Sequence, residues 1–418
     1  MGNRVAVETL GCRLNQAESE SLARELSACG YRVVHAADGA DVYVLNTCTV
    51  THVADRKSRH LLRLARRRNP RALVIAIGCY PQRAMKELDG LEAVDVVLDN
   101  DRKGAILEVI KDRCENGSDQ GVGPSPVLRT RSMVKVQEGC NQFCTYCIVP
   151  YVRGGERSLP PDQVVREVAE RAKEGYREAT LTGTEIGAYE PGLATVVQRV
   201  LAESGIERLR LSSIRPRDLT PELLSLWNDV RLCPHVHIPL QSGSDTVLQR
   251  MGRPYSAAEY ADAVALVREA VPRVSVSTDV LVGFPGETGE EFEESFAFCR
   301  AMGFGGIHVF TYSERPGTVA AGMGHKVAES QKALRSKRML ELAKESVHRY
   351  RRRYLGHEAA VLWEREVGNG VWTGYTDNYV RVFTRSDQPL HNAVTVARLT
   401  GWRGEDLWAT PSVSSSCR

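Results

Sequence analysis

The clearest chemical feature of this sequence is a group of three cysteines in EGCNQFCTYCIVP, residues 138–150. Cys140, Cys144 and Cys147 follow the spacing C-x3-C-x2-C. A structural zinc site normally has four protein ligands, and a disulfide framework needs an even number of cysteines in a secreted protein. Three thiolates on a four-iron cluster instead leave one iron open for another ligand. A zinc site whose fourth ligand comes from elsewhere in the chain is the alternative.

A second group of three cysteines lies in the N-terminal part of the chain. Cys12, Cys48 and Cys79 each follow an expected strand, namely 5–8, 42–45 and 73–77. The carboxyl ends of parallel strands meet at the sheet edge where open α/β sheets bind ligands. We therefore expect these thiols to converge on a second three-cysteine site. The alternative is three unrelated buried cysteines, since a free cysteine is often a core residue.

The elements needed to position these cysteines are visible as alternating strand and helix patterns. Residues 1–113 predict a doubly wound parallel sheet, with expected helices at 17–27 and 54–68. A stretch rich in Gly, Ser and Pro predicts a linker at 114–128. Residues 129–354 predict a full or partial parallel barrel, and residues 355–418 a small all-β barrel. The barrel strands are expected at 133–137, 179–182, 208–212, 235–239, 275–282 and 306–310.

Composition places the chain among ordinary globular proteins. It has 418 residues, 42% of them hydrophobic, and a formal net charge of +3. The sequence contains no apolar run long enough for a membrane-spanning helix, and its beginning lacks an apolar signal core. We therefore expect a cytoplasmic protein with no membrane partner. In a reducing compartment its 11 cysteines favour metal binding or catalysis over disulfides.

Two basic segments indicate nucleic acid as a partner. Residues 54–71 predict a helix with Arg or Lys at most positions outside a stripe formed by Leu61, Leu64 and Ala65. Residues 348–354, HRYRRRY, alternate basic and aromatic side chains. Basic patches attract phosphates and aromatic rings can stack on bases. A solvated helix face is the alternative for either segment.

The cysteine motifs resemble those of a known family. CNQFCTYC after a strand resembles the radical SAM superfamily, and the longer EGCNQFCTYCIVPYVRGGERS resembles the methylthiotransferases. This resemblance implies that S-adenosyl-L-methionine binds the open iron of a [4Fe-4S] cluster and is cleaved to a 5′-deoxyadenosyl radical. ETLGCRLNQAES, LNTCTVT and AIGCYPQ resemble the auxiliary-cluster domain of these enzymes. GYTDNYVRV, residues 374–382, resembles a TRAM domain, a small RNA-binding barrel.

Further segments match the family in order and spacing: LTGTEIGAY, HIPLQSGSDTVLQRMGRPY, TDVLVGFPGET and TYSERPGT. They imply five cofactor-binding residues, Gly183, Glu185, Gln241, Ser242 and Asp279. One departure is Arg215 in SSIRP, where family members often carry an acidic residue. The remaining cysteines match no ligand position of the family and are expected to be packing or surface residues: Cys29, Cys114, Cys233, Cys299 and Cys417.

The resemblance implies two [4Fe-4S] clusters and S-adenosyl-L-methionine as cofactors. The cluster on Cys140, Cys144 and Cys147 would cleave the cofactor, and the cluster on Cys12, Cys48 and Cys79 would carry or activate sulfur. The cysteine segments most resemble the subfamily that modifies N6-threonylcarbamoyladenosine beside the anticodon of tRNA. Expected partners are the anticodon stem-loop and an electron donor such as flavodoxin or ferredoxin.

Three other functions stay open from the sequence. Sister subfamilies act on isopentenyladenosine in tRNA or on an aspartate of a ribosomal protein. A non-catalytic iron–sulfur protein that binds RNA is the alternative of another class. Against it, an electron-transfer cluster normally has four cysteine ligands.

Overall fold

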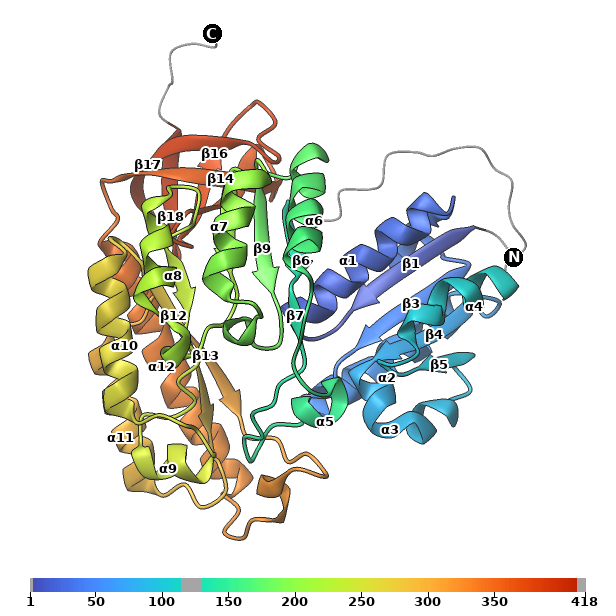
Figure 1. The fold of residues 1–418 in the computed structure, drawn as a ribbon, viewed down its shortest axis with the longest axis horizontal. Coiled ribbons are helices and arrows are strands. Elements are labelled where there is room, and N and C mark those ends of the chain that lie inside the picture. Colours follow the sequence, from blue (N-terminus) through green and yellow to red (C-terminus); the bar gives the residue numbers. More distant parts are fainter. Residues whose placement is uncertain (1–2, 114–129, 412–418) are drawn as a thin grey trace. The chain divides into compact units, whose positions relative to one another are not determined.

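A computed structural model describes residues 3–113 and 130–411 (Figure 1). The chain forms two compact units. The first comprises Met1–Leu128, Glu138–Arg157 and Ser313–Ala321, and the second comprises Arg129–Gln137, Ser158–Tyr312 and Gly322–Arg418. The first unit therefore contains both groups of three cysteines. The predicted linker, Cys114 and Cys417 lie outside the described residues.

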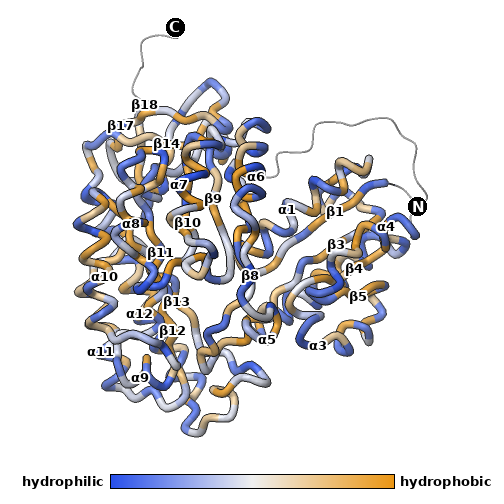
Figure 2. Tube along the Cα trace, viewed as in Figure 1, coloured by the Kyte–Doolittle hydropathy of each residue, from blue (hydrophilic) through white to orange (hydrophobic). Residues whose placement is uncertain are grey.

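The first unit is built on a five-stranded parallel sheet with the order β2-β1-β3-β4-β5. Its strands are β1 (Arg4–Thr9), β2 (Arg32–Val33), β3 (Val42–Thr47), β4 (Leu73–Gly78) and β5 (Val96–Leu98). Every residue of β3 and β4 is buried, and Figure 2 shows how apolar these strands are. Strands buried on both faces read as continuous apolar runs, which is why they were predictable. The two-residue strand β2 was not predicted.

Helices cover both faces of this sheet, as the doubly wound prediction requires. One face packs on α1 (Arg13–Ala28) and α4 (Ile106–Arg113). The other packs on α2 (His52–Arg68) and α3 (Cys79–Asp89). Helix α2 begins at a cap in which the Thr51 hydroxyl accepts a hydrogen bond from the amide of Ala54. Of the predicted stripe, Ala65 is buried, whereas Leu62 is buried in place of the half-buried Leu61 and Leu64.

The core of the second unit is a curved array of six parallel strands. They are β6 (Arg131–Lys135), β9 (Glu178–Thr182), β10 (Arg208–Leu211), β11 (His235–His237), β12 (Ser275–Val282) and β13 (Gly306–Thr311). They form two three-stranded sheets, β10-β9-β6 and β11-β12-β13. Isolated bridges join the sheets where Leu209 pairs with Leu232 and Ser213 pairs with His237. The predicted partial barrel is confirmed.

Helices cover the outer face of this partial barrel. They are α6 (Pro161–Lys173), α7 (Leu193–Glu203), α8 (Pro221–Ser225), α9 (Asp245–Arg250), α10 (Ala257–Ala270), α11 (Gly289–Met302) and α12 (Glu329–Arg352). Helices α10 and α11 each begin with a capping box, which fixes where they start. No described helix is long and apolar enough to cross a membrane.

Alternate residues of the barrel strands point to opposite faces, and this sorts apolar from polar side chains. Val236, Val276 and Val280 belong to the apolar core shared with the helices. On β12, the residues that alternate with this core are Ser275, Ser277 and Asp279. The inner face of this sheet is therefore polar where the outer face is apolar.

The C-terminal residues form the predicted small barrel. Its strands are β14 (Glu358–Glu366), β15 (Val371–Thr376), β16 (Arg381–Arg385), β17 (Val394–Arg403) and β18 (Asp406–Pro411), closed in the order β14-β15-β16-β18-β17. Its core includes the fully buried Trp363 together with Tyr350 and Tyr354. The tyrosines of HRYRRRY are therefore structural, and the expectation that they stack on bases is wrong.

A buried ion cluster fixes the C-terminal barrel to the partial barrel. Glu178, fully buried, accepts a hydrogen bond of 2.7 Å from Arg210, and the Nε of Arg208 lies 2.9 Å from its Oε2. Arg210 also donates to the carbonyls of Thr376 and Asp377 in the C-terminal barrel. Glu178 and Arg208 are the first residues of their strands. The small barrel therefore sits at the end where the parallel strands begin.

Replacing Glu178 by Gln should destabilise this junction. Burial raises the pKa of Glu178, but Arg210 and its neighbours outweigh burial and hold it at about 2, so the carboxylate is charged at neutral pH. Its removal leaves buried guanidinium groups without a counter-charge, and breaking such a pair costs about 3–5 kcal/mol. Chemical unfolding of Glu178→Gln measures this loss. The exposed Glu203→Gln is the control, and equal unfolding midpoints for the two variants would contradict the prediction.

Candidate active site

The first unit brings Cys12, Cys48 and Cys79 together at one edge of its sheet. Each follows one of three neighbouring strands, β1, β3 and β4, at its carboxyl end. Gly11 has a positive φ of 102°, and a Cβ at this position would lie 2.8 Å from the Sγ of Cys48. Only glycine permits this approach of the two cysteine loops. The predicted convergence is what the structure shows.

The electrostatics of these thiols suit a bound cation. Burial raises the pKa of Cys48 to about 12, and the neighbouring Cys79 and Cys12 raise it further. Burial also raises the pKa of Cys12, with Cys79 adding to the effect and Arg153 opposing it. Each further negative charge is unfavourable beside these neighbouring thiols, so positive charge among them would favour their thiolate forms. Soft sulfur ligands of this kind fit an iron–sulfur cluster.

The second group of cysteines lies in a tight loop between β7 (Gln137–Glu138) and the short helix α5 (Val149–Arg153). The amide of Cys140 donates to the carbonyl of Gly154, and the amide of Cys147 donates to that of Cys144, both at 3.0 Å. A Cβ on Gly139 would lie only 1.8 Å from the carbonyl oxygen of Gly155. Cys144 is buried, whereas Cys140 and Cys147 are partly exposed. A loop closed in this way presents three thiols from eight residues, as a cluster with an open iron needs.

Arg153, directly after this loop, reaches the N-terminal cysteines within the same unit. Its guanidinium donates to both carboxylate oxygens of Glu18 and, at 2.5 Å, to the Oδ1 of Asn15. The same Oδ1 accepts the thiol of Cys12 at 3.6 Å. Burial raises the pKa of Glu18, but Arg153 and Lys103 outweigh it and hold the pKa at about 2. Arg153 thus supplies fixed positive charge beside the cysteines of the sheet edge.

A second contact between the cysteine segments runs through Asn100. Its side-chain amide donates to the carbonyl of Val152 at 2.7 Å and lies 3.9 Å from the Sγ of Cys79. Cys79 also packs in an apolar cluster with Ile148 and Val152. Helix α5, which follows the Cys140 loop, is therefore held against Cys79.

The loop after Cys48 is held by a buried polar network. The Thr49 hydroxyl donates to Asp55 at 2.6 Å and accepts from Arg83 and Arg315. Arg315 comes from the TYSERPGT segment, donates to Asp55 at 2.7 Å and is only 1% exposed. This segment, residues 311–318, falls within the predicted barrel of residues 129–354, but from Ser313 onward it belongs to the first unit.

Gly183 and Glu185, two predicted cofactor-binding residues, follow strand β9 in the second unit. A Cβ on Gly183 would lie 2.7 Å from the carbonyl oxygen of Gln137, so only glycine fits there. Burial raises the pKa of Glu185 to about 7, against the effect of Arg215. Arg215, the departure noted in the sequence, lies 3.5 Å from Glu185 and 2.8 Å from Asp218. The arginine therefore makes an ion cluster with the predicted cofactor residue.

The other predicted cofactor residues follow β11 and lie on β12. Gln241 has a positive φ of 72°, and its amide donates to the carbonyl of Asp279. Ser242 is 1% exposed, and its hydroxyl accepts the amide of Ser244. This hydrogen bond lies within the turn formed by Ser242 and Ser244.

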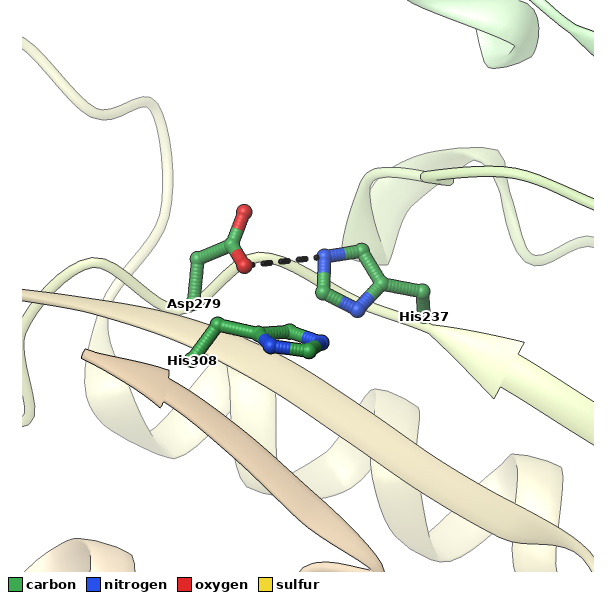
Figure 3. A group of neighbouring side chains, drawn as sticks. All are labelled: His237, Asp279 and His308. Carbon is green, nitrogen blue, oxygen red and sulfur yellow. Dashed lines mark ion pairs between the residues drawn. The ribbon is translucent and has the colours of Figure 1, made fainter. Parts of the chain in front are cut away.

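Asp279 lies in a group that sequence reasoning missed (Figure 3). The Nε2 of His237 is 3.2 Å from the Oδ1 of Asp279. His308 joins them from strand β13, and the polar atoms of the three side chains lie within 4.8 Å of one another. The alternation of β11, β12 and β13 was the available signal, because it places all three residues on one face. Arg153, Asn100 and Arg315 carried no such signal, since their partners are distant in sequence.

Replacing Arg153 by Met should destabilise the first unit. Glu18 would lose its main partner while its side chain is only 8% exposed, and loss of one member of such a pair costs about 3–5 kcal/mol. Denaturant unfolding of the variant measures the change in free energy. Arg157→Met is the matched control, because Arg157 is 60% exposed in its contact with Glu138. A loss no larger than that of the control would contradict the prediction.

Comparison with known proteins finds two matching family models. Residues 134–299 match the radical SAM superfamily, and residues 4–99 match a family described as uncharacterized protein family UPF0004. "Threonylcarbamoyladenosine tRNA methylthiotransferase MtaB" of Bacillus subtilis is 36% identical over 94% of this chain and 93% of its own length. The MtaB protein of Thermotoga maritima is 38% identical over 90% of each chain.

One relative named for another substrate and one solved structure are also similar to this chain. "tRNA-2-methylthio-N(6)-dimethylallyladenosine synthase" of Thermodesulfovibrio yellowstonii is 33% identical over 90% of this chain and 91% of its own length. The radical S-adenosylmethionine methyltransferase TsrM of Kitasatospora setae shares the fold, with a TM-score of 0.55, 16% identity and 77% of each chain covered. The chain therefore belongs to the radical SAM methylthiotransferase family.

Proposed function

We propose that this enzyme adds a methylthio group to N6-threonylcarbamoyladenosine beside the anticodon of tRNA. The presence of two three-cysteine groups in one compact unit carries the proposal, because the two groups would hold the two clusters that it requires. Four relatives named for threonylcarbamoyladenosine are 34–38% identical to this chain, and three of them exceed the 32–35% of the four relatives named for dimethylallyladenosine. A dimethylallyladenosine or ribosomal-protein substrate is the competing assignment.

The residues of the Cys140 loop would hold the cluster of the radical SAM reaction. When bound, this cluster supplies the one-electron chemistry that cleaves S-adenosyl-L-methionine. The tight loop fixes the directions of Cys140, Cys144 and Cys147, and the burial of Cys144 limits the access of water. Three protein ligands leave one position for the cofactor, which a fourth cysteine would have filled.

Cys12, Cys48 and Cys79 are proposed to hold the second [4Fe-4S] cluster, the one that serves sulfur insertion. Arg153 and Asn15 would orient this site, since the pair lies beside Cys12. Thr49 and its buried partners would keep the Cys48 loop rigid. The role of these residues is positioning and charge balance, and the hard chemistry belongs to the cofactors.

The five predicted cofactor-binding residues are kept as proposed contacts of S-adenosyl-L-methionine: Gly183, Glu185, Gln241, Ser242 and Asp279. Support differs among them. Glu185 is a buried carboxylate at the end of a barrel strand, where barrel enzymes bind their substrates. The hydroxyl of Ser242 accepts one hydrogen bond in its turn and keeps its own proton to donate.

Two surfaces are proposed to bind the anticodon stem-loop. Helix α2 exposes Arg56, Lys57, Arg63 and Arg67 on the side away from its buried stripe. The small C-terminal barrel is the proposed TRAM domain. Flavodoxin or ferredoxin is proposed as the electron donor, and the cytoplasmic location stays a prediction.

Nucleoside mass spectrometry of tRNA tests the substrate assignment. In cells lacking this gene, we expect the methylthio form of threonylcarbamoyladenosine to disappear and the unmethylthiolated nucleoside to accumulate. Restoring the gene should restore the product. Loss of methylthio-dimethylallyladenosine instead would assign the sister substrate, and unchanged tRNA would contradict a tRNA substrate in cells without a second such enzyme.

Single cysteine replacements should separate the two cluster sites. Cys144→Ala should abolish 5′-deoxyadenosine formation by the anaerobically reduced protein. Cys48→Ala should keep that cleavage and its iron at the Cys140 loop, yet form no methylthiolated product. The exposed Cys29→Ala is the control and should retain both reactions. Product formed by Cys48→Ala would remove the second cluster from the reaction.

A further inference from the structure

Three polar side chains form a group on the inner face of the second unit that the cysteine chemistry does not use. Strands β11, β12 and β13 place His237, Asp279 and His308 side by side (Figure 3). In the parallel register Asp279 pairs with His308. His237 pairs with Ser277, which lies two residues before Asp279 on β12. Neighbours in register point to the same face, so the group is built by the sheet itself.

The strands hold two of these side chains in fixed positions. His237 is 8% exposed, and its two ring nitrogens contact the Ser277 hydroxyl at 2.9 Å and the carboxylate of Asp279 at 3.2 Å. Its orientation is therefore determined from both sides. His308 is exposed on strand β13, with its ring centroid 5.6 Å from that of His237.

The group lies in the part of the barrel where substrates are bound. His237 is the last residue of β11, and Asp279 and His308 each precede the end of their strand by three residues. Barrel enzymes carry out their reactions at the carboxyl ends of the strands. At the other end, His235 stacks on Tyr379 of the C-terminal barrel with centroids 4.6 Å apart. That end is therefore closed by protein.

We propose that this group recognises the threonylcarbamoyl substituent of the substrate, with His308 donating a hydrogen bond to its carboxylate. The inference rests on the proposed function. The substituent carries a carboxylate, a hydroxyl and ureido N–H groups, so it offers acceptors to the imidazoles and donors to Asp279. A dimethylallyl substituent offers none, and covering a carboxylate and two imidazoles with it would leave polar groups unpaired.

Asp279 acts in this arrangement as a positioning residue for His237. Its Oδ1 faces the His237 ring, so Oδ2 can still serve the proposed contact with the cofactor. A divalent cation is the competing occupant, because two histidines and one carboxylate also form a common metal site. One carboxylate balances only half the charge of such a cation.

The test compares three anticodon stem-loop RNAs that differ at one nucleoside. They carry threonylcarbamoyladenosine, its methyl ester or unmodified adenosine, and their binding to the reconstituted protein is followed by fluorescence anisotropy. The wild-type protein should prefer the acid over the ester by about tenfold or more, the range for hydrogen bonds to charged groups. His308→Leu should lose this preference and still bind the unmodified RNA as the wild type does.

Two further variants sharpen the comparison. His308→Gln keeps an N–H donor and should retain part of the preference, which a purely structural role would not explain. His35→Leu is the control, because His35 is an exposed histidine of the first unit and lies outside the cysteine segments and both proposed RNA surfaces. It should keep the full preference for the acid.

The outcomes separate this inference from the proposed function. An unchanged acid-over-ester preference in His308→Leu would overturn the inference even if the enzyme makes the methylthio product. Loss of the preference when wild-type protein is treated with a chelator would overturn it in favour of a divalent cation. Absence of methylthio-threonylcarbamoyladenosine in the cellular assay would instead overturn the proposed function.

Discussion

The buried guanidinium of Arg153 is the interaction on which the arrangement of the first unit depends. It belongs to the segment that carries Cys140, Cys144 and Cys147, yet its partners are Glu18 and Asn15 on helix α1. A side chain only 3% exposed must have its charge balanced, and Glu18 supplies that balance. This ion pair therefore joins the two cysteine segments, together with the Asn100 contact and the packing of Cys79 against Ile148 and Val152.

Because the strands are parallel, different groups of residues gather at their carboxyl ends and at their amino ends. Cysteines follow the carboxyl ends of β1, β3 and β4, and His237, Asp279 and His308 lie toward the carboxyl ends of the barrel strands. The amino ends of β9 and β10 carry Glu178 and Arg208, whose contacts hold the C-terminal barrel. Within the partial barrel, the His237 group and the residues that hold the C-terminal barrel thus lie toward opposite ends of the parallel strands.

Sequence patterns predicted the parts of this design that depend on local periodicity. The apolar runs of β3 and β4 and the spacing of the cysteines were sufficient for the sheet and for both three-cysteine groups. The two-residue β2 was too short to give a pattern, and the burial of Tyr350 depends on a barrel that begins after it. Arg153 and Glu18 are 135 positions apart, and no local rule pairs them.

On the polar inner face of the partial barrel, the requirements of strand stability differ from those of the proposed function. A strand buried on both faces is most stable when both faces are apolar, yet β12 alternates Val276, Thr278 and Val280 with Ser277 and Asp279. Polar groups retained in such a place lower stability unless they find partners. His237 contacts Asp279 and Ser277, and His308 is the exposed member of the group. Because an exposed donor at the substrate end of a barrel costs little until something apolar covers it, the same residue can both tolerate an empty site and reject an apolar substituent.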